Sequence, residues 1–175
     1  EVIANEKRVN AFELKIDRDC EDIFALFQPV AVDLRFVLAV LKINSNLERI
    51  GDLADSISRY ILDAKIPFNS ELIEKTQLIT MFDMGIKMLE DLITSFEQED
   101  TKIARAIFKE DEKMDALNFK SPEIITSCII ENHELTSECL QILSIVRKLE
   151  RLGDQAKNIA EEIIFYIEAK VLKHN

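Results

Sequence analysis

Apolar residues recur at intervals of three and four along almost the whole chain, and no long segment alternates with a period of two. This spacing places apolar side chains on one face of a helix. We therefore predict five helices, at about residues 2–27, 29–64, 70–97, 102–131 and 133–170. Long helices joined by short connections pack as antiparallel neighbours, so the pattern predicts an all-α bundle.

Polar and helix-breaking residues mark the ends of these predicted helices. Gln28 and Pro29 end the first helix, and Pro29 is expected in the first turn of the second. The expected N-caps of the later helices are Asn69 or Ser70, Asp100 or Thr101, and Asn132. Pro122 lies inside the fourth helix and is expected to kink or restart it, because proline lacks a backbone N–H group.

One eleven-residue stretch is written twice, as LERIGDLADSI at 47–57 and as LERLGDQAKNI at 149–159, an offset of 102 residues. EKRVNAFE at 6–13 likewise parallels DEKMDALN at 111–118, at an offset of 105. Two consecutive helices thus recur in the same order, which predicts a duplicated unit. The second copy is preceded by the helix at 70–97, whereas the first copy has no such helix.

The duplication predicts two helical repeats, an N-terminally incomplete one at residues 1–66 and a second at 67–175. The chain opens at Glu1 rather than at a methionine. Two alternatives remain open for the helix that the first repeat lacks. Either the protein has no such helix, or it precedes Glu1 in a longer chain.

The composition narrows the class of protein. Apolar residues make up 47% of the chain, which is enough for a core. The formal charge of −11 argues against a nucleic-acid binder and against attraction to an anionic membrane surface. The sequence contains neither a signal peptide nor an apolar run of about eighteen residues, so we expect a cytoplasmic protein that meets a membrane only through partners.

Carboxylates at a spacing of four residues are the strongest chemical signal. The pairs are Glu48 and Asp52, Glu150 and Asp154, and Asp111 and Asp115. Each pair projects from one helical face, and pairs that face each other across two helices repel strongly unless a cation lies between them. All-oxygen ligands favour hard cations such as Mg²⁺, Mn²⁺ or Fe³⁺. The missing Glu-x-x-His motif argues against an oxygen-activating di-iron site.

Two of the three glycines, Gly51 and Gly153, each stand one residue before the second carboxylate of a motif. A glycine in the middle of a helix costs about 0.5–1 kcal/mol relative to alanine. We expect this cost to be offset because the glycine allows the close approach of another helix or of a metal site. The alternative is a surface stretch with local ion pairs worth a few tenths of a kcal/mol each.

The stretch FQPVAVDLRFVLAVLKINSNLERIGDLADSI resembles the PhoU family of phosphate-signalling regulators, which carry Gln-Pro-Val-Ala-x-Asp-Leu-Arg leading to Glu-Arg-Ile-Gly-Asp. KEDEKMDALN and LERLGDQAKNIAEE are similar to the second half of that family. The resemblance extends over essentially the whole chain. It implies tandem three-helix bundles related by pseudo-twofold symmetry, of which the first lacks its first helix.

The resemblance also implies metal ions, with iron, manganese, magnesium and zinc as candidates. Carried over position by position, the second site consists of Asp111, Asp115, Glu150 and Asp154, and the first site of Glu6, Asn10, Glu48 and Asp52. Asn10 stands where the family usually has aspartate, so the first site loses a charge and is expected to bind metal more weakly.

The function that the resemblance implies is regulation without catalysis. Such a protein negatively regulates the phosphate-starvation response and controls phosphate uptake and homeostasis. Its expected partners are the ATPase of a phosphate ABC transporter and a phosphate-sensing histidine kinase. The open apolar face of an incomplete bundle predicts a homodimer. Three alternatives are a PhoU-like domain of a sodium/phosphate cotransporter, a carboxylate-bridged di-metal enzyme and a metal-free helical scaffold.

Overall fold

The computed structural model describes residues 2–64 and 67–172, and all the secondary structure in these residues is helical. In chain order the elements are α1 (Val2–Phe27), α2 (Ala31–Asp63), α3 (Ser70–Lys75), α4 (Leu78–Gln98), α5 (Thr101–Glu131), the 3₁₀ turn η1 (His133–Leu135) and α6 (Thr136–Glu168). The predicted all-α bundle is confirmed.

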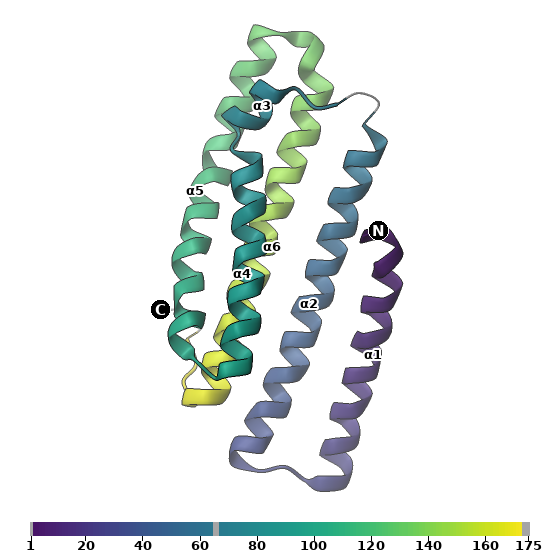
Figure 1. Ribbon diagram of the computed structural model, residues 1–175, viewed down its shortest axis with the longest axis vertical. Coiled ribbons are helices and arrows are strands. Elements are labelled where there is room, and N and C mark those ends of the chain that lie inside the picture. The colour runs from purple at the N-terminus through teal and green to yellow at the C-terminus, as the bar shows by residue number, and fades with distance from the viewer. Residues whose placement is uncertain (1, 65–66, 173–175) are drawn as a thin grey trace.

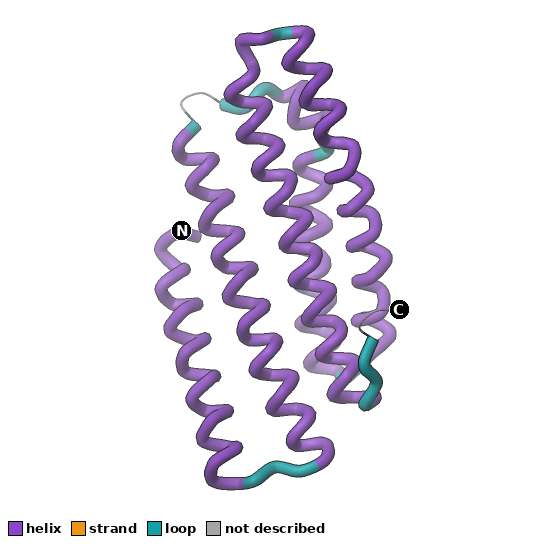
Figure 2. Tube along the Cα trace, turned by 180° about the vertical axis from the view of Figure 1, so that it is seen from behind, coloured by secondary structure: helices purple, strands orange, loops and turns teal. Residues whose placement is uncertain are grey.

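The long helices lie side by side along the long axis of the molecule (Figure 1). α1 and α2 form an antiparallel hairpin on one side, and α4, α5 and α6 form a three-helix group on the other. The view from behind shows the same two groups (Figure 2). α6 packs against α2, α4 and α5, so it joins the hairpin to the three-helix group.

The core follows from this arrangement. α6 has the most buried residues of any helix, including the completely buried Ile142, Val146 and Ile163. On α1, by contrast, Cys20 is the one buried side chain among those described. The hydrophobic core therefore lies within the three-helix group and its seam with α2, and α1 is held mainly by α2.

The predicted caps are confirmed at the starts of α3 and α5, and Asn132 caps the 3₁₀ turn η1 that leads into α6. The side-chain oxygens of Asn69, Asp100 and Asn132 accept hydrogen bonds of 2.8–3.2 Å from backbone N–H groups of the first turn that follows each of them. The start of the second helix differs from the prediction. α2 begins at Ala31, so Pro29 belongs to the connection and not to the first turn.

The predicted helix at 70–97 is interrupted, so that part of the prediction is wrong. Gln77 adopts φ 52° and separates α3 from α4. Thr76 ends α3 with its N–H and its hydroxyl both bonded to the carbonyl oxygen of Leu72, at 3.1 and 2.8 Å. Leu72 and Leu78 are both buried on the two sides of this break.

Of the kink or restart predicted at Pro122, the restart is wrong, because α5 runs through this residue to Glu131. A proline leaves one carbonyl of the preceding turn without its helical partner. Two neighbouring side chains bond to backbone carbonyls in this stretch: Ser121 Oγ donates to the oxygen of Leu117 and Thr126 Oγ1 donates to that of Pro122.

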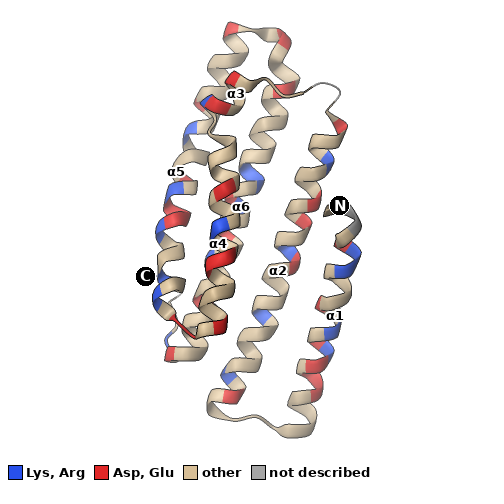
Figure 3. Cartoon of the chain, in the orientation of Figure 1, with Lys and Arg blue, Asp and Glu red and all other residues tan. Residues whose placement is uncertain are grey.

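None of the helices in the described part of the chain has a stretch long and apolar enough to cross a membrane. Acidic and basic residues are instead spread over all the long helices (Figure 3).

Candidate metal centre

α5 and α6 approach each other closely at Gly153. A Cβ atom added there would lie 3.1 Å from Asp111 Oδ1 and 3.1 Å from Met114 Sδ, so a side chain at this position would displace these two side chains of α5. Gly51 has the corresponding position on α2, where a Cβ would lie 3.2 Å from Val9 Cγ1 on α1. Each motif glycine thus lets its helix approach the neighbouring helix that carries the matching polar residues.

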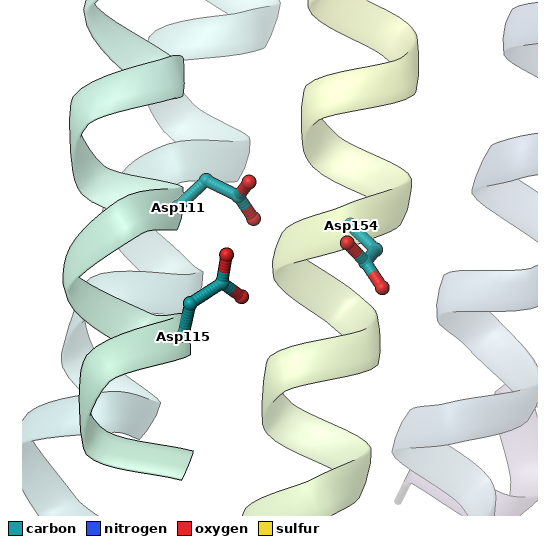
Figure 4. Close-up of side chains that lie close together, drawn as sticks. All are labelled: Asp111, Asp115 and Asp154. Atoms are coloured by element: carbon teal, nitrogen blue, oxygen red, sulfur yellow. The ribbon is translucent and has the colours of Figure 1, made fainter. Parts of the chain in front are cut away.

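Three aspartates gather at the α5–α6 contact. Asp111 and Asp115 project from successive turns of α5 toward α6, where Asp154 lies (Figure 4). One carboxylate oxygen from each residue can be chosen so that all three lie within 4.8 Å of one another. We call these three residues the aspartate cluster. Asp111 is buried, whereas Asp115 is exposed, so the cluster opens to solvent on one side.

Asp111 is the inner member of the cluster, with 1% of its side chain exposed. Its Oδ2 accepts a hydrogen bond of 2.7 Å from Nζ of Lys157 on α6. Its Oδ1 is buried and has no hydrogen-bond partner within the described residues. A buried carboxylate oxygen without a partner is costly, so Asp111 presents one ligand atom that lacks compensation.

Burial and mutual repulsion raise the pKa values of the acidic side chains in the cluster. Burial, followed by the charges of Asp111 and Asp115, raises the pKa of Asp154. The pKa of Asp115 is raised by burial and then by Asp111. The pKa of Lys157 is also raised, chiefly by its hydrogen bond to Asp111. Like charges therefore crowd each other here, and the one lysine does not neutralise them.

The charge and the donor atoms of the cluster fit a divalent cation. Three carboxylates and one ammonium group leave two negative charges, which a divalent ion neutralises. The donors are all oxygen atoms, the type that Mg²⁺, Mn²⁺ and iron accept. The unpartnered Oδ1 of Asp111 would be the inner ligand of such an ion, and the cluster is open to solvent at Asp115.

Glu150, the fourth residue predicted for this site, lies next to the aspartate cluster and is not part of it. Burial, then Asp154, Asp115 and Asp111, raise its pKa, so its carboxylate is in the field of the cluster. Glu150 precedes Asp154 by one helical turn and is half-buried. The sequence therefore placed all four acids in one region, of which the structure brings three into ligand-sharing distance.

The residues predicted for the first site are less closely gathered. Within residues 2–64 and 67–172, the carboxylates of Glu6, Glu48 and Asp52 form no comparable cluster. Asn10 Nδ2 donates a long hydrogen bond of 3.4 Å to Glu6 Oε1. On α2, burial and then the neighbouring Asp52 raise the pKa of Glu48.

Sequence reasoning missed Lys157. It follows Asp154 by three residues and therefore lies on the same face of α6, which was the available signal. The residue at the equivalent position of the first repeat, 102 residues earlier, is Asp55, which pairs with Arg59 at 2.6 Å. The two repeats thus differ in the charge that accompanies their acidic motifs.

Comparison with known proteins identifies the family. The model of the PhoU domain matches residues 1–61 and 78–163. The phosphate-specific transport system accessory protein PhoU of Escherichia coli K12 is 34% identical over 176 residues, which cover 99% of this chain and 71% of that protein. The protein of the same name from Edwardsiella tarda is 33% identical, covering 99% of this chain and 70% of its own length.

Two solved structures have the same fold. The crystal structure of PhoU from Pseudomonas aeruginosa matches with a TM-score of 0.86 at 27% identity, over 97% of this chain and 80% of that one. The phosphate transport system regulatory protein PhoU from Streptococcus pneumoniae matches with a TM-score of 0.85 at 28% identity, over 98% and 80%. This is a family of accessory and regulatory proteins, not of enzymes. The chain belongs to the PhoU family.

Proposed function

We propose that this protein is a metal-binding regulator of phosphate uptake that acts in the cytoplasm. It represses the phosphate-starvation response when phosphate is plentiful. Its partners are the ATPase of a phosphate ABC transporter and a phosphate-sensing histidine kinase, and its binding to one changes its action on the other. Residues 1–66 and 67–175 are its two helical repeats.

The observation that carries this proposal is the match over nearly the whole chain to proteins named accessory proteins of the phosphate-specific transport system. The long, closely packed helices offer extended surfaces for two partner proteins, which is the kind of interaction that an adaptor needs. The acidic composition suits the recognition of basic surfaces on those partners.

The proposed metal ligands are the aspartate cluster, with Glu150 as an additional ligand or as an acceptor for metal-bound water. Their support is the charge surplus of the cluster and the unpartnered Oδ1 of Asp111. Glu6, Asn10, Glu48 and Asp52 are proposed as a second, weaker site. Metal analysis of the purified protein would identify which of iron, manganese, magnesium and zinc is bound.

Metal analysis of the purified protein tests the metal part of the proposal. We expect bound metal in the wild type and its loss from the double variant Glu150→Gln, Asp154→Asn, with unchanged helix content by circular dichroism. Asp83→Asn is the matched control, because Asp83 is an exposed aspartate of α4 outside the cluster. Wild-type stoichiometry in the double variant would show that the ligand assignment is wrong.

A reporter of phosphate starvation tests the regulatory part. Deletion of the gene should raise expression of the reporter in phosphate-rich medium, and the wild-type gene should restore repression. The double variant should restore it less well than Asp83→Asn does, at equal protein levels. Unchanged reporter expression in the deletion strain would rule out the regulatory role.

A homodimer is part of the proposal. Phe12 and Leu26 of α1 are 57% and 73% exposed, and Val32 of α2 is 58% exposed, so the hairpin carries apolar surface that a second copy can cover. Light scattering at high protein concentration should give the mass of a dimer. A monomer under these conditions would contradict this assembly.

A further inference from the structure

A polar pocket of about 350 Å³ lies between α2 and α6, and Asp52 is the one lining residue that it shares with the proposed metal sites. We call it the seam pocket. Its lining residues are Arg49, Asp52, Leu53 and Ser56 of α2, and Lys148, Arg151 and Gln155 of α6. Three cationic side chains and one carboxylate thus meet where the hairpin joins the three-helix group.

Among the described residues, the three cations of the seam pocket form no close ion pairs, although the charge of Arg49 acts on Glu48 and that of Arg151 acts on Glu150 and Asp154. Within the described residues, none of Arg49, Lys148 and Arg151 forms an ion pair or a side-chain hydrogen bond. Lys148 Nζ instead lies 5.5 Å from the centre of the Tyr60 ring. The lining therefore has three positive charges and one negative charge, a local surplus of two in a chain whose formal charge is −11.

A second pocket between α2 and α6 can be compared with the seam pocket. It is lined by Lys42, Ser45, Asn46, Arg49, Asn158, Glu161 and Glu162. The repeat offset of 102 residues relates three of these residues to residues of the seam pocket: Asn46 to Lys148, Arg49 to Arg151, and Asn158 to Ser56. We call it the balanced pocket, because its two basic and two acidic residues cancel.

The balanced pocket also has an internal ion pair, between Lys42 Nζ and Glu162 Oε1 at 3.0 Å. The repeat-equivalent of Glu162 is Tyr60, so the seam pocket has no carboxylate at this position. The acids of α6 thus neutralise the balanced pocket, whereas the lining of the seam pocket keeps a surplus of positive charge. A cationic pocket that the protein does not neutralise is suited to an anionic ligand.

The single carboxylate determines which anion fits. Guanidinium groups donate two parallel hydrogen bonds to an oxyanion, and Lys148 adds a third cationic donor. Asp52, by contrast, only accepts hydrogen bonds when it is ionised, so an anion beside it must donate a proton of its own. Phosphate keeps at least one P–OH group at neutral pH, whereas sulfate has none. We propose that the seam pocket binds a protonated tetrahedral oxyanion, with inorganic phosphate as the probe.

Two neutral groups complete the pocket. The Ser56 hydroxyl both donates and accepts. The Oε1 atom of Gln155 is buried and has no hydrogen-bond partner in the described part of the chain. An amide at this position turns either its donor or its acceptor side to a ligand, because the two sides have the same shape. A phosphate in the pocket offers this amide the partner that it lacks.

Calorimetric titration of the chelator-treated protein tests the proposal. Chelation removes bound cations, so phosphate cannot be held through a metal ion. At constant ionic strength, we expect one phosphate per chain and sulfate binding at least about tenfold weaker, which is the effect of one hydrogen bond to a charged group. Asp52→Asn should reduce the preference for phosphate over sulfate.

Substitutions in the two pockets locate the binding site. Arg151→Gln should weaken phosphate binding about tenfold or more, and Lys42→Met, in the balanced pocket, should leave it unchanged within about twofold. Arg151 is exposed, so the variant should fold, and circular dichroism checks this. Lys148→Met is a second variant of the seam pocket and should also weaken binding.

Several results would overturn the proposal. They are the absence of phosphate binding to the wild type, equal binding of sulfate, and equal losses in Arg151→Gln and Lys42→Met. A regulatory role of the seam pocket rests on the proposed function, whereas phosphate binding to the pocket does not depend on it. Binding without any effect of the gene on the starvation reporter would refute the proposed function alone. A normal reporter response without phosphate binding would refute the pocket alone.

Discussion

Replacing Asp154 with asparagine removes one of three clustered negative charges and keeps the shape of the side chain. In the metal-free protein this should increase stability, because Asp154 repels Asp111 and Asp115 within 4.8 Å. In the presence of metal it should have the opposite effect, because a ligand is lost. A change of sign between the two conditions distinguishes a metal site from an ordinary surface cluster.

The size of both effects follows from the geometry. Two unit charges at this separation repel by about 1 kcal/mol in water and by about 3 kcal/mol at an effective dielectric constant of about 20. Asp154 keeps access to solvent and Lys157 offsets part of the repulsion, so we expect a net gain of about 1 kcal/mol. For a domain of this size that gain raises the melting temperature by about 2–4 °C.

Metal binding to the wild type should exceed this gain. A ligand present at a hundred times its dissociation constant stabilises the folded state by about 2.7 kcal/mol. That corresponds to about 5–10 °C in melting temperature. Thermal unfolding followed by circular dichroism, with a chelator and then with excess Mn²⁺, should therefore show the variant above the wild type in the first condition and below it in the second.

The dependence on pH provides a check on the cause. Because burial and the neighbouring aspartates raise the pKa of Asp154 above its ordinary value of 3.8, the folded state binds this proton more tightly than the unfolded state. The associated stability is fully present below the ordinary pKa and is lost as the pH rises through the raised value. The advantage of Asp154→Asn over the metal-free wild type should therefore shrink as the pH falls from 7.

Two results would refute this reasoning. If Asp154→Asn lowers the melting temperature of the metal-free protein, the carboxylate forms a favourable contact that we have not identified. If the variant keeps the full stabilisation by Mn²⁺, the ion binds elsewhere. The control Asp83→Asn should change the stability of the metal-free protein by no more than about 0.5 kcal/mol, as is usual for surface substitutions. It should change the stabilisation by Mn²⁺ by no more than this amount either.

Three further substitutions test other contacts of the site and the seam. Gly153→Ala should lower stability by about 1–3 kcal/mol and weaken Mn²⁺ binding in titration calorimetry, because its methyl group would displace Asp111. Lys157→Met should cost the metal-free protein about 1.5–3 kcal/mol in urea unfolding, and Mn²⁺ should restore more stability than it adds to the wild type. Glu162→Gln should cost about 1–2 kcal/mol, because it breaks the pair with Lys42, and high salt should reduce this loss.

The bundle was predictable because apolar periodicity and capping residues act locally. Asn69, Asp100 and Asn132 cap the helix starts that their positions indicated. The left-handed turn at Gln77 was not predictable, because neither glycine nor proline marks it. In one continuous helix, Leu72 and Leu78 would point about 120° apart. The break allows both side chains to reach the core, so tertiary packing overrides helix propensity here.

For the candidate site, the sequence predicted only which residues share a helical face. Spacing by four residues showed that Asp111 and Asp115 share a face, and the repeat suggested which helix they meet. The rotation of α5 against α6 decides which oxygens come together, and it depends on the packing of Gly153. The sequence therefore did not distinguish Glu150, beside the cluster, from Asp154, within it.

The repeat also suggested more symmetry than the structure has. Equivalent motifs predicted an acidic site in each half, with the first the weaker. The structure adds that the position of Lys157 is taken in the first repeat by Asp55, which pairs with Arg59. Asn10 replaces a carboxylate on α1, which removes one more charge from the first set. Such differences lie in the sequence itself, but their effect depends on which side chains face each other across the helices.

The most direct test of the metal centre is a crystal structure of the Mn²⁺-treated protein, with diffraction data collected at the manganese absorption edge. We predict an anomalous peak within bonding distance of carboxylate oxygens from Asp111, Asp115 and Asp154, about 2.0–2.3 Å away. A map without a peak between α5 and α6, with Asp111 bound to Lys157 alone, would contradict a metal centre at this position.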